Sequence, residues 1–124
     1  MRPQVFGYLH CVRADPTMMA RLARRIALYA KREYLDLAHV FADSGVRGTV
    51  LLRPAFAVVL EELAKPDVSG LIIPSLDHLS RCRQMRAILE RRLDRIGAVL
   101  YIMPHAGGHD DHVRAGRAAR WSSR

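Results

Sequence analysis

Arginines are the residues of this sequence whose chemistry is most distinctive, and many of them lie in one segment. Guanidinium groups stay charged at physiological pH and bind phosphate oxygens through two parallel hydrogen bonds. The segment could contact nucleic-acid phosphates, or it could be an ordinary solvated face in which Glu90 and Asp94 form local ion pairs. The arginines concerned are Arg81, Arg83, Arg86, Arg91, Arg92 and Arg95.

A second group of polar side chains lies near the C-terminus and could chelate a divalent ion. It consists of His105, His109, Asp110, Asp111 and His112. No cysteine accompanies these residues and glycines interrupt them, so we expect no functional metal site and no cofactor. The arginines that follow, with Trp121, could form a basic arm with one stacking aromatic, or a plain solvated terminus.

The overall charge points to a polyanionic partner. The chain of 124 residues carries a formal net charge of +8 and has a pI near 10.5, which favours nucleic acid first and an acidic membrane surface second. Arginine-rich composition alone could also reflect a GC-rich genome. No apolar run reaches the ~20 residues that span a bilayer, and no secretory leader is evident. We expect no membrane partner.

The two cysteines, Cys11 and Cys82, are too few for a disulfide framework. We expect both to be small buried hydrophobic residues. A reducing bacterial cytoplasm is the compartment consistent with them, and the protein would be associated with the nucleoid if it binds DNA.

The elements that must position these side chains alternate between apolar strands and amphipathic helices. Strands are expected at 4–12, 35–41, 70–74 and 98–103, and helices at 16–33, 54–64 and 81–96. Asp15 is the expected N-cap of the first helix, a loop is expected at 43–48, and Gly97 should end the last helix.

This alternation predicts an α/β three-layer sandwich, with a mostly parallel central sheet flanked by helices. We expect one domain over residues 1–104. Residues 105–124 lose the helical periodicity and are expected to be a basic, disordered tail.

Several segments taken together resemble the catalytic domain of serine recombinases, the resolvase and invertase family. Phe6-Gly7-Tyr8 resembles the start of the family's first strand, and Gly45-x-x-Gly48 resembles its mobile loop. Arg53-Pro54 resembles the arginine that precedes the next helix. Leu76-Asp77-His78-Leu79-Ser80-Arg81 is similar to the signature Leu-Asp-Arg-Leu-(Ser/Gly)-Arg. The resemblance covers about residues 4–103 and implies a resolvase-like fold.

The resemblance also implies a chemistry. In the family, a serine hydroxyl attacks a DNA phosphodiester and forms a 5′-phosphoserine link. Arginines neutralise the charge that develops on the phosphoryl oxygens, and an aspartate orients them. Arg53 and Arg81 stand at two of the phosphate-binding positions, and Asp77 stands at the position of the orienting acid.

Three other active-site positions depart from the family pattern. His10 and His78 replace arginines, and Val12 occupies the position of the nucleophilic serine. Valine has no nucleophilic atom, and histidine is shorter than arginine and largely neutral at pH 7. We therefore expect a degenerate recombinase domain with no intact catalytic site. It would bind DNA phosphates without sequence specificity and would neither cleave nor join DNA.

A substitute nucleophile is not expected at the neighbouring positions. Cys11 should point to the opposite face of the strand from its neighbours. Ser44 should lie in a loop, and Ser80 should cap the arginine-rich helix.

Another class of function is also consistent with the sequence. The chain could be a non-catalytic interaction or dimerisation module, such as a homodimer or an inhibitory partner of an intact recombinase. A gene remnant without a selected function is a third alternative. The long dimer-forming helix and the DNA-binding domain that follow the catalytic domain in the family are not expected here.

Overall fold

Parallel strands alternate with helices along this chain. The computed structural model describes residues 2–13, 15–44, 53–80, 82–104 and 118–119. The elements in chain order are β1 (Gln4–Cys11), α1 (Pro16–Arg32), β2 (Asp36–Ser44), α2 (Pro54–Leu63), β3 (Val68–Ile73), the short 3-10 helix η2 (Leu76–His78), α3 (Arg83–Arg95), β4 (Val99–Ile102) and β5 (Ala118–Ala119).

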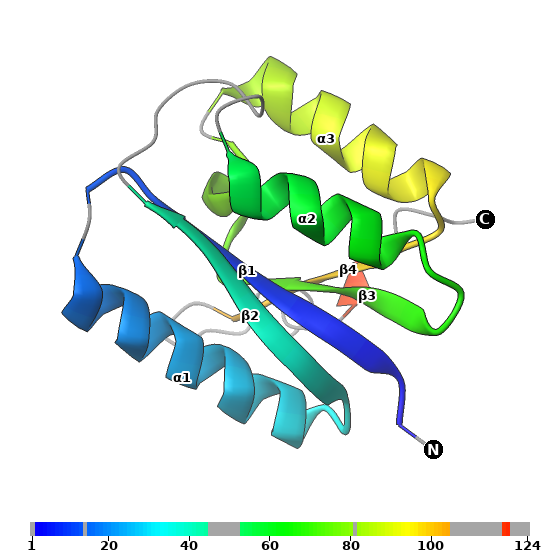
Figure 1. Ribbon diagram of the computed structural model, residues 1–124, viewed down its shortest axis with the longest axis horizontal. Helices are drawn as coiled ribbons and strands as arrows, with labels where there is room; N and C mark the ends of the chain where they lie inside the picture. The colour runs from blue at the N-terminus through cyan, green and yellow to red at the C-terminus, as the bar shows by residue number, and fades with distance from the viewer. Residues whose placement is uncertain (1, 14, 45–52, 81, 105–117, 120–124) are drawn as a thin grey trace.

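The sheet has the strand order β2-β1-β3-β4-β5 (Figure 1). Strands β1 to β4 pair in parallel, and β5 pairs antiparallel with β4. The predicted mostly parallel sheet is therefore confirmed. The order also means that the chain leaves β1 toward one edge of the sheet and crosses back past β1 to reach β3.

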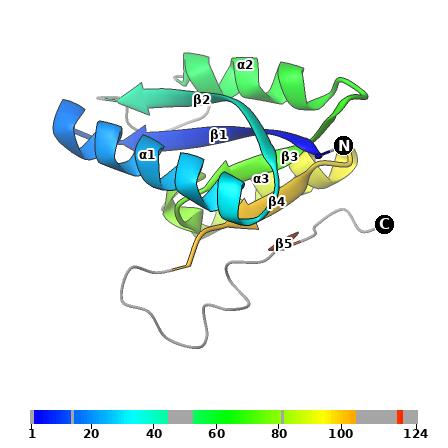
Figure 2. The same ribbon diagram turned by 90° about the horizontal axis from the view of Figure 1, so that it is seen from below.

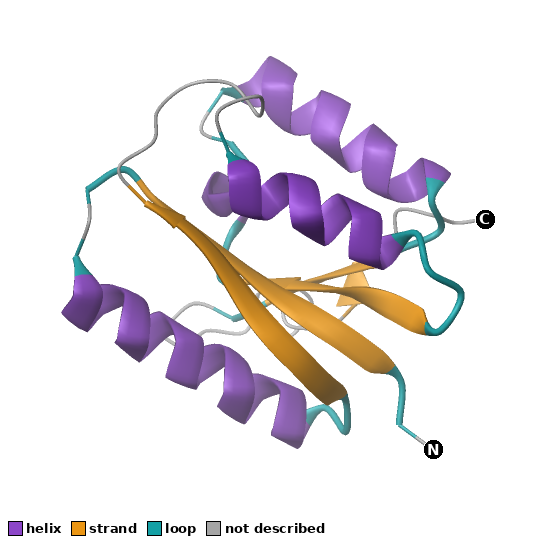
Figure 3. Cartoon of the chain, viewed as in Figure 1, coloured by secondary structure: helices purple, strands orange, loops and turns teal. Residues whose placement is uncertain are grey.

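Helices cover both faces of the sheet, which confirms the predicted three layers (Figures 2 and 3). Side chains alternate along β1 between the two faces. Val5 and Leu9 pack on the α1 side with Ile26, whereas Phe6 and Tyr8 belong to the core under α2 and α3. Among the described helices, α1 thus covers one face, and α2 and α3 share the other.

Local sequence signals predicted several helix ends correctly. The side chain of Asp15 accepts a hydrogen bond from the Met18 amide at 3.1 Å, as expected of an N-cap, and Pro16 follows at the first helical position. Gly97 ends the last long helix with a φ of 77°, a left-handed conformation that favours glycine.

Other element ends differ from the sequence prediction. Strand β2 continues to Ser44, because it pairs with β1 as far as Cys11, so Ser44 lies in a strand and not in a loop. Strand β1 stops one residue before Val12. The helix expected from residue 81 begins at Arg83, with Cys82 as its N-cap residue, and it is preceded by the short helix η2. The rest of the predicted loop lies outside the described residues.

The expectation that both cysteines are buried was wrong. Cys11 is only half-buried as the last residue of β1, and Cys82 is exposed as the N-cap residue of α3. Of the apolar residues on α3, Leu89 and Leu93 are buried, but Ile88 is 49% exposed. The helix packs through a narrow stripe and leaves Ile88 outside it.

The segment 105–124, predicted to be a disordered basic tail, is described only at residues 118–119. These two residues form β5 beside Leu100 and Tyr101 of β4. The remainder of that prediction lies outside the described residues. Among the helices that the structure describes, none is long and apolar enough to cross a membrane.

The close contact between β3 and β4 leads to a prediction about stability. A Cβ atom on Gly70 would overlap the backbone carbonyl of Val99, which cannot move without breaking the sheet. Gly70→Ala should therefore lower the free energy of unfolding by about 3 kcal/mol in urea denaturation. Gly97→Ala is the control: it meets no atom within 4 Å and should lose only about 1 kcal/mol from its left-handed backbone. Equal losses would contradict this packing.

Candidate functional site

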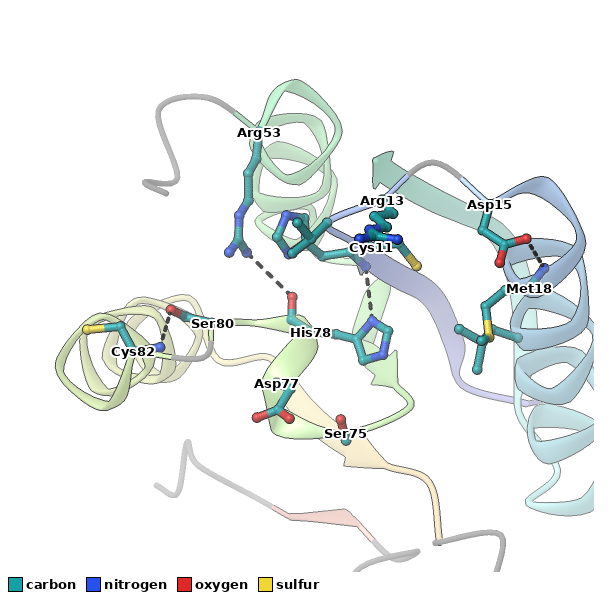
Figure 4. Close-up of a pocket in the computed structure, with 13 residues that line it drawn as sticks. Cys11, Arg13, Asp15, Met18, Arg53, Ser75, Asp77, His78, Ser80 and Cys82 are labelled. Atoms are coloured by element: carbon teal, nitrogen blue, oxygen red, sulfur yellow. Dashed lines mark hydrogen bonds between the residues drawn. The ribbon is translucent and has the colours of Figure 1, made fainter. Parts of the chain in front are cut away.

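An open pocket of about 830 Å³ lies where the parallel strands end. In a sheet of this order, the chain departs from β1 and β3 in opposite directions, which leaves a crevice at their carboxyl ends. The residues around it come from the end of β1, from the N-terminal half of α1 and from the connections β1–α1, β2–α2 and β3–α3 (Figure 4). They are His10, Cys11, Val12, Arg13, Asp15, Met18, Leu22, Arg53, Ser75, Asp77, His78, Ser80 and Cys82.

The start of α2, and with it Arg53, is held by a carboxylate from another element. Asp43, buried near the end of β2, accepts hydrogen bonds from the amides of Ala55 at 2.9 Å and Phe56 at 3.0 Å. Amides in the first turn of a helix have no partner within the helix. Arg53 is itself the N-cap residue but provides no side-chain cap, so Asp43 supplies the missing acceptor.

The side chain of Tyr8 also binds the Asp43 carboxylate. Its hydroxyl donates a hydrogen bond to Asp43 Oδ2 at 2.7 Å, and its ring packs edge-on against Phe56 with centroids 4.9 Å apart. Burial, and then the hydrogen bond and charge of Asp43, raise the pKa of Tyr8 well above its usual range, while the charge of Arg53 opposes this. The phenol therefore stays protonated and acts as a donor.

Arg53 is the buried cation of the pocket, only 3% exposed. Its Nη1 donates to the carbonyl of His78 at 3.4 Å (Figure 4) and, by a shorter contact, to that of Leu79. Its Nε is buried without a hydrogen-bond partner. Within the described part of the chain, the only ion pairs are made by other residues. Arg53 is thus a buried charge that backbone carbonyls hold and no contacting carboxylate neutralises.

Asp77 is exposed, and its partner is an arginine that the resemblance did not indicate. Its Oδ1 accepts from Arg86 Nη2 at 3.1 Å, and Arg86 Nε donates to the carbonyl of Ser80 at 3.2 Å. Arg86 thereby ties the first turn of α3 to the pocket rim. Arg81, expected as the second phosphate ligand, lies outside the described residues.

The two histidines meet at the pocket. The backbone N–H of His10 donates to His78 Nδ1 at 3.0 Å. Because this Nδ1 acts as an acceptor, a neutral His78 carries its proton on Nε2. The contact joins the end of β1 to η2, so His78 has a positioning role as well as a place in the pocket wall.

No strong nucleophile stands at the end of β1. Val12 lines the pocket and is 37% exposed. Cys11 faces the α1 side, as alternation predicts, yet it also lines the pocket, which extends around the end of β1 to Met18 and Leu22. Burial, and then the charge of Asp15, raise the pKa of the Cys11 thiol, which keeps it in its weakly nucleophilic protonated form.

Ser80 is buried and its hydroxyl is engaged. Its Oγ accepts a hydrogen bond from the Cys82 amide at 3.0 Å. The predicted capping role is therefore modified, since Cys82, not Ser80, is the N-cap residue of α3.

Sequence reasoning missed several residues of the site. Arg13 and Ser75 line the pocket, and Asp43 and Tyr8 hold Arg53 in place. The signal available for Asp43 was its place in the sequence: it is an acidic residue that precedes a glycine-containing segment and an Arg-Pro helix start. No group of three or more metal-ligating side chains is found over the residues that the structure describes.

Comparisons with known proteins bear on this fold. The family model described as "Resolvase, N terminal domain" matches residues 6–118. No curated protein matches the chain.

Solved structures of similar fold include three recombination proteins. The N-terminal catalytic domain of TP901-1 integrase has a TM-score of 0.66 at 18% identity, covering 81% of this chain and 76% of that one. The C-terminal catalytic domain of ISC1926 TnpA, an IS607-like serine recombinase, gives 0.73 at 15% identity, with coverage of 86% and 71%. A resolvase family site-specific recombinase from Streptococcus pneumoniae gives 0.68 at 15%, with coverage of 95% and 76%.

The Tyr8–Asp43 contact leads to a prediction about pH. Tyr8→Phe should lose about 1 kcal/mol at neutral pH, because it removes one buried hydrogen bond. Since the native pKa of Tyr8 is raised above about 10, the unfolded value, the native state keeps this proton above pH 10. Stability should therefore fall as pH rises, by up to about 1.4 kcal/mol per pH unit.

Urea denaturation from pH 7 to pH 11 measures this effect. Tyr8→Phe should show a shallower decline above pH 10 than the unchanged protein. Tyr34→Phe, at a tyrosine that is 73% exposed, should leave the decline unaltered. Equal slopes for the Tyr8→Phe variant and the unchanged protein would contradict the buried hydrogen bond.

Proposed function

This chain belongs to the resolvase N-terminal domain family, and we propose that it binds DNA phosphates in its pocket without cleaving or joining DNA. The observation that carries the proposal is the state of Arg53. A buried guanidinium with an unpartnered Nε and no contacting carboxylate lines an open pocket. A phosphate oxygen could satisfy such a donor and compensate the buried charge.

The absence of cleavage follows from the residue types. Val12 stands where the family's serine would attack phosphorus, and it offers no lone pair. Cys11 is held in its protonated form by burial, and the Ser80 hydroxyl is engaged with the Cys82 amide. We therefore infer that none of these three residues forms a covalent bond to DNA.

The charge at the pocket also supports binding over catalysis. Catalysis of phosphoryl transfer depends on cations that neutralise charge in the transition state. His10 and His78 replace two such cations, and the Nδ1 of His78 accepts a backbone hydrogen bond that protonation would remove. Arg53, with Arg81 as the proposed second ligand, retains enough charge to hold a ground-state phosphate.

Binding of this kind recognises the phosphate backbone of DNA and not its bases. It should be non-specific and strongly salt-dependent. We assign it to a domain at 1–104, with residues 105–124 as a basic extension, in a cytoplasmic protein associated with the nucleoid.

A second candidate function, dimerisation or binding of another protein, is favoured by exposed apolar residues. Val58 on α2 and Ile88 on α3 are 42% and 49% exposed, and both helices cover the same face of the sheet. Self-association measured by sedimentation, lost in Val58→Ser/Ile88→Ser, would support this candidate.

A DNA titration tests the role of Arg53. Arg53→Gln should raise the Kd for duplex DNA about tenfold at moderate salt and lower the slope of log K against log salt by about 0.9, the value for one phosphate contact. Lys65→Gln is the matched control, because Lys65 is exposed at the other end of α2, beside Glu62. Equal effects of the two substitutions would overturn the pocket assignment. Arg53→Lys, which keeps the charge, replaces Arg53→Gln if the latter does not fold.

A serine introduced at position 12 tests whether the missing nucleophile alone prevents cleavage. Val12→Ser alone should give no covalent adduct with supercoiled or duplex DNA in denaturing gels, because His10 and His78 leave the transition state poorly compensated. The triple change Val12→Ser/His10→Arg/His78→Arg is the comparison. An adduct with Val12→Ser alone would show that the remaining site is competent and that only the serine was missing.

A further inference from the structure

The outer face of α1 carries a row of basic side chains that the pocket does not use. They are Arg21, Arg24, Arg25, Lys31 and Arg32. We propose that this row, here called the α1 basic face, is a second binding surface for the DNA backbone. It goes beyond the pocket function, because it lies on the helix that covers the opposite face of the sheet from α2 and α3 (Figure 1).

Helical spacing gathers these cations on one side. The other four cations lie three, four, ten and eleven residues after Arg21, and these spacings place all five on one face of an α-helix. The other side of α1 carries Ile26, Tyr29 and Ala30, which are buried against the sheet. All of the basic residues except Arg25, which is half-buried, are exposed. The helix is therefore fixed by its apolar side with its cations pointing to solvent.

The charge of the α1 basic face is not cancelled locally. Helix α1 contains no acidic residue, and none of its cations forms an ion pair with any residue that the structure describes. The neighbouring carboxylates of Asp15, Glu33 and Asp36 lie at the two ends of the helix. By contrast, α3 includes Glu90 and Asp94, so its arginine run is partly balanced.

Nucleic acid fits this face better than a membrane does. A helix that binds a bilayer surface inserts an apolar side among the lipids, but the apolar side of α1 is already buried in the core. Leu28, 57% exposed, is the large apolar residue within the basic row. Between Arg21 and Arg32 the helix rises about 16 Å, and duplex DNA offers a phosphate charge about every 1.7 Å along that length.

The α1 basic face also adjoins the pocket. Asp15, the N-cap residue of α1, and Met18 line the pocket on the side opposite Arg53 (Figure 4), and Leu22 of α1 also lines it. Arg21 follows within one helical turn of Met18. A duplex that places one phosphate in the pocket could therefore extend its backbone along α1, and the two surfaces would add to the affinity independently.

Charge removal on the full-length chain tests the proposal. Arg21→Gln/Arg24→Gln/Arg32→Gln should raise the Kd for a 20-base-pair duplex at least about tenfold at moderate salt. The slope of log K against log salt should fall by about 2.7, or 0.9 for each of three phosphate contacts. All three side chains are exposed, so thermal unfolding should be unchanged. The Lys versions of the same substitutions should restore most of the binding, because they keep the charge.

The matched control removes the same charge from the other helical layer. Arg91→Gln/Arg92→Gln/Arg95→Gln changes three exposed arginines of α3 and should alter the Kd much less. Equal weakening by the two triple variants would show that net charge alone governs binding and would overturn the α1 assignment. So would unchanged binding by the α1 variant. Arg53→Gln, titrated in parallel, reports on the pocket separately, so each proposal can fail alone.

A vesicle experiment tests whether an anionic membrane surface, and not DNA, is the partner of the α1 basic face. Vesicles containing one-third phosphatidylserine should bind the chain much more weakly than duplex DNA does at the same salt. Strong vesicle binding that depends on the three α1 arginines, together with DNA binding that does not, would overturn the proposal in favour of a membrane surface.

Discussion

The carboxylate of Asp43 is the constraint on which the pocket depends. It accepts hydrogen bonds from two amides at the start of α2 and from the Tyr8 hydroxyl, and so connects β2, α2 and β1 at one point. A helix start placed by a distant acceptor is fixed relative to the sheet, not merely capped. Arg53, the residue just before Pro54, takes its position from this arrangement.

The burial of Arg53 makes the pocket an unusual electrostatic environment. Buried cations are normally paired with an acid, because desolvation of an isolated charge is unfavourable. Here the carbonyls of His78 and Leu79 accept hydrogen bonds from Nη1 of Arg53, and no ion pair of Arg53 is found among the described residues. The neighbouring carboxylate Asp77 pairs with Arg86. The site therefore holds a buried cation whose Nε has no hydrogen-bond partner among the described residues, and this is the feature on which the proposed phosphate binding rests.

The sequence predicted features that depend on short-range signals. Asp15, Pro16 and Gly97 mark element ends through local backbone requirements, and apolar runs of strand length separated by amphipathic helices indicate a parallel sheet. Features that depend on docking were missed. The reach of Asp43 to α2, the pairing of Asp77 with Arg86 and the exposure of Ile88 all follow from how helices pack on the sheet. That the cations of α1 form no ion pair with the described residues can be established only from the three-dimensional structure.

The two histidines illustrate why a family pattern cannot be read position by position. The N–H of His10 donates to His78 Nδ1, an interaction that arginine could not accept because a guanidinium has no acceptor atom. An arginine at position 78 would leave the amide at the end of β1 in need of another partner. A histidine at position 78 thus makes a structural contact between β1 and η2 that an arginine could not make. This hydrogen bond couples the end of β1 to the neighbouring wall of the pocket, so a change at position 78 also disturbs the backbone at position 10.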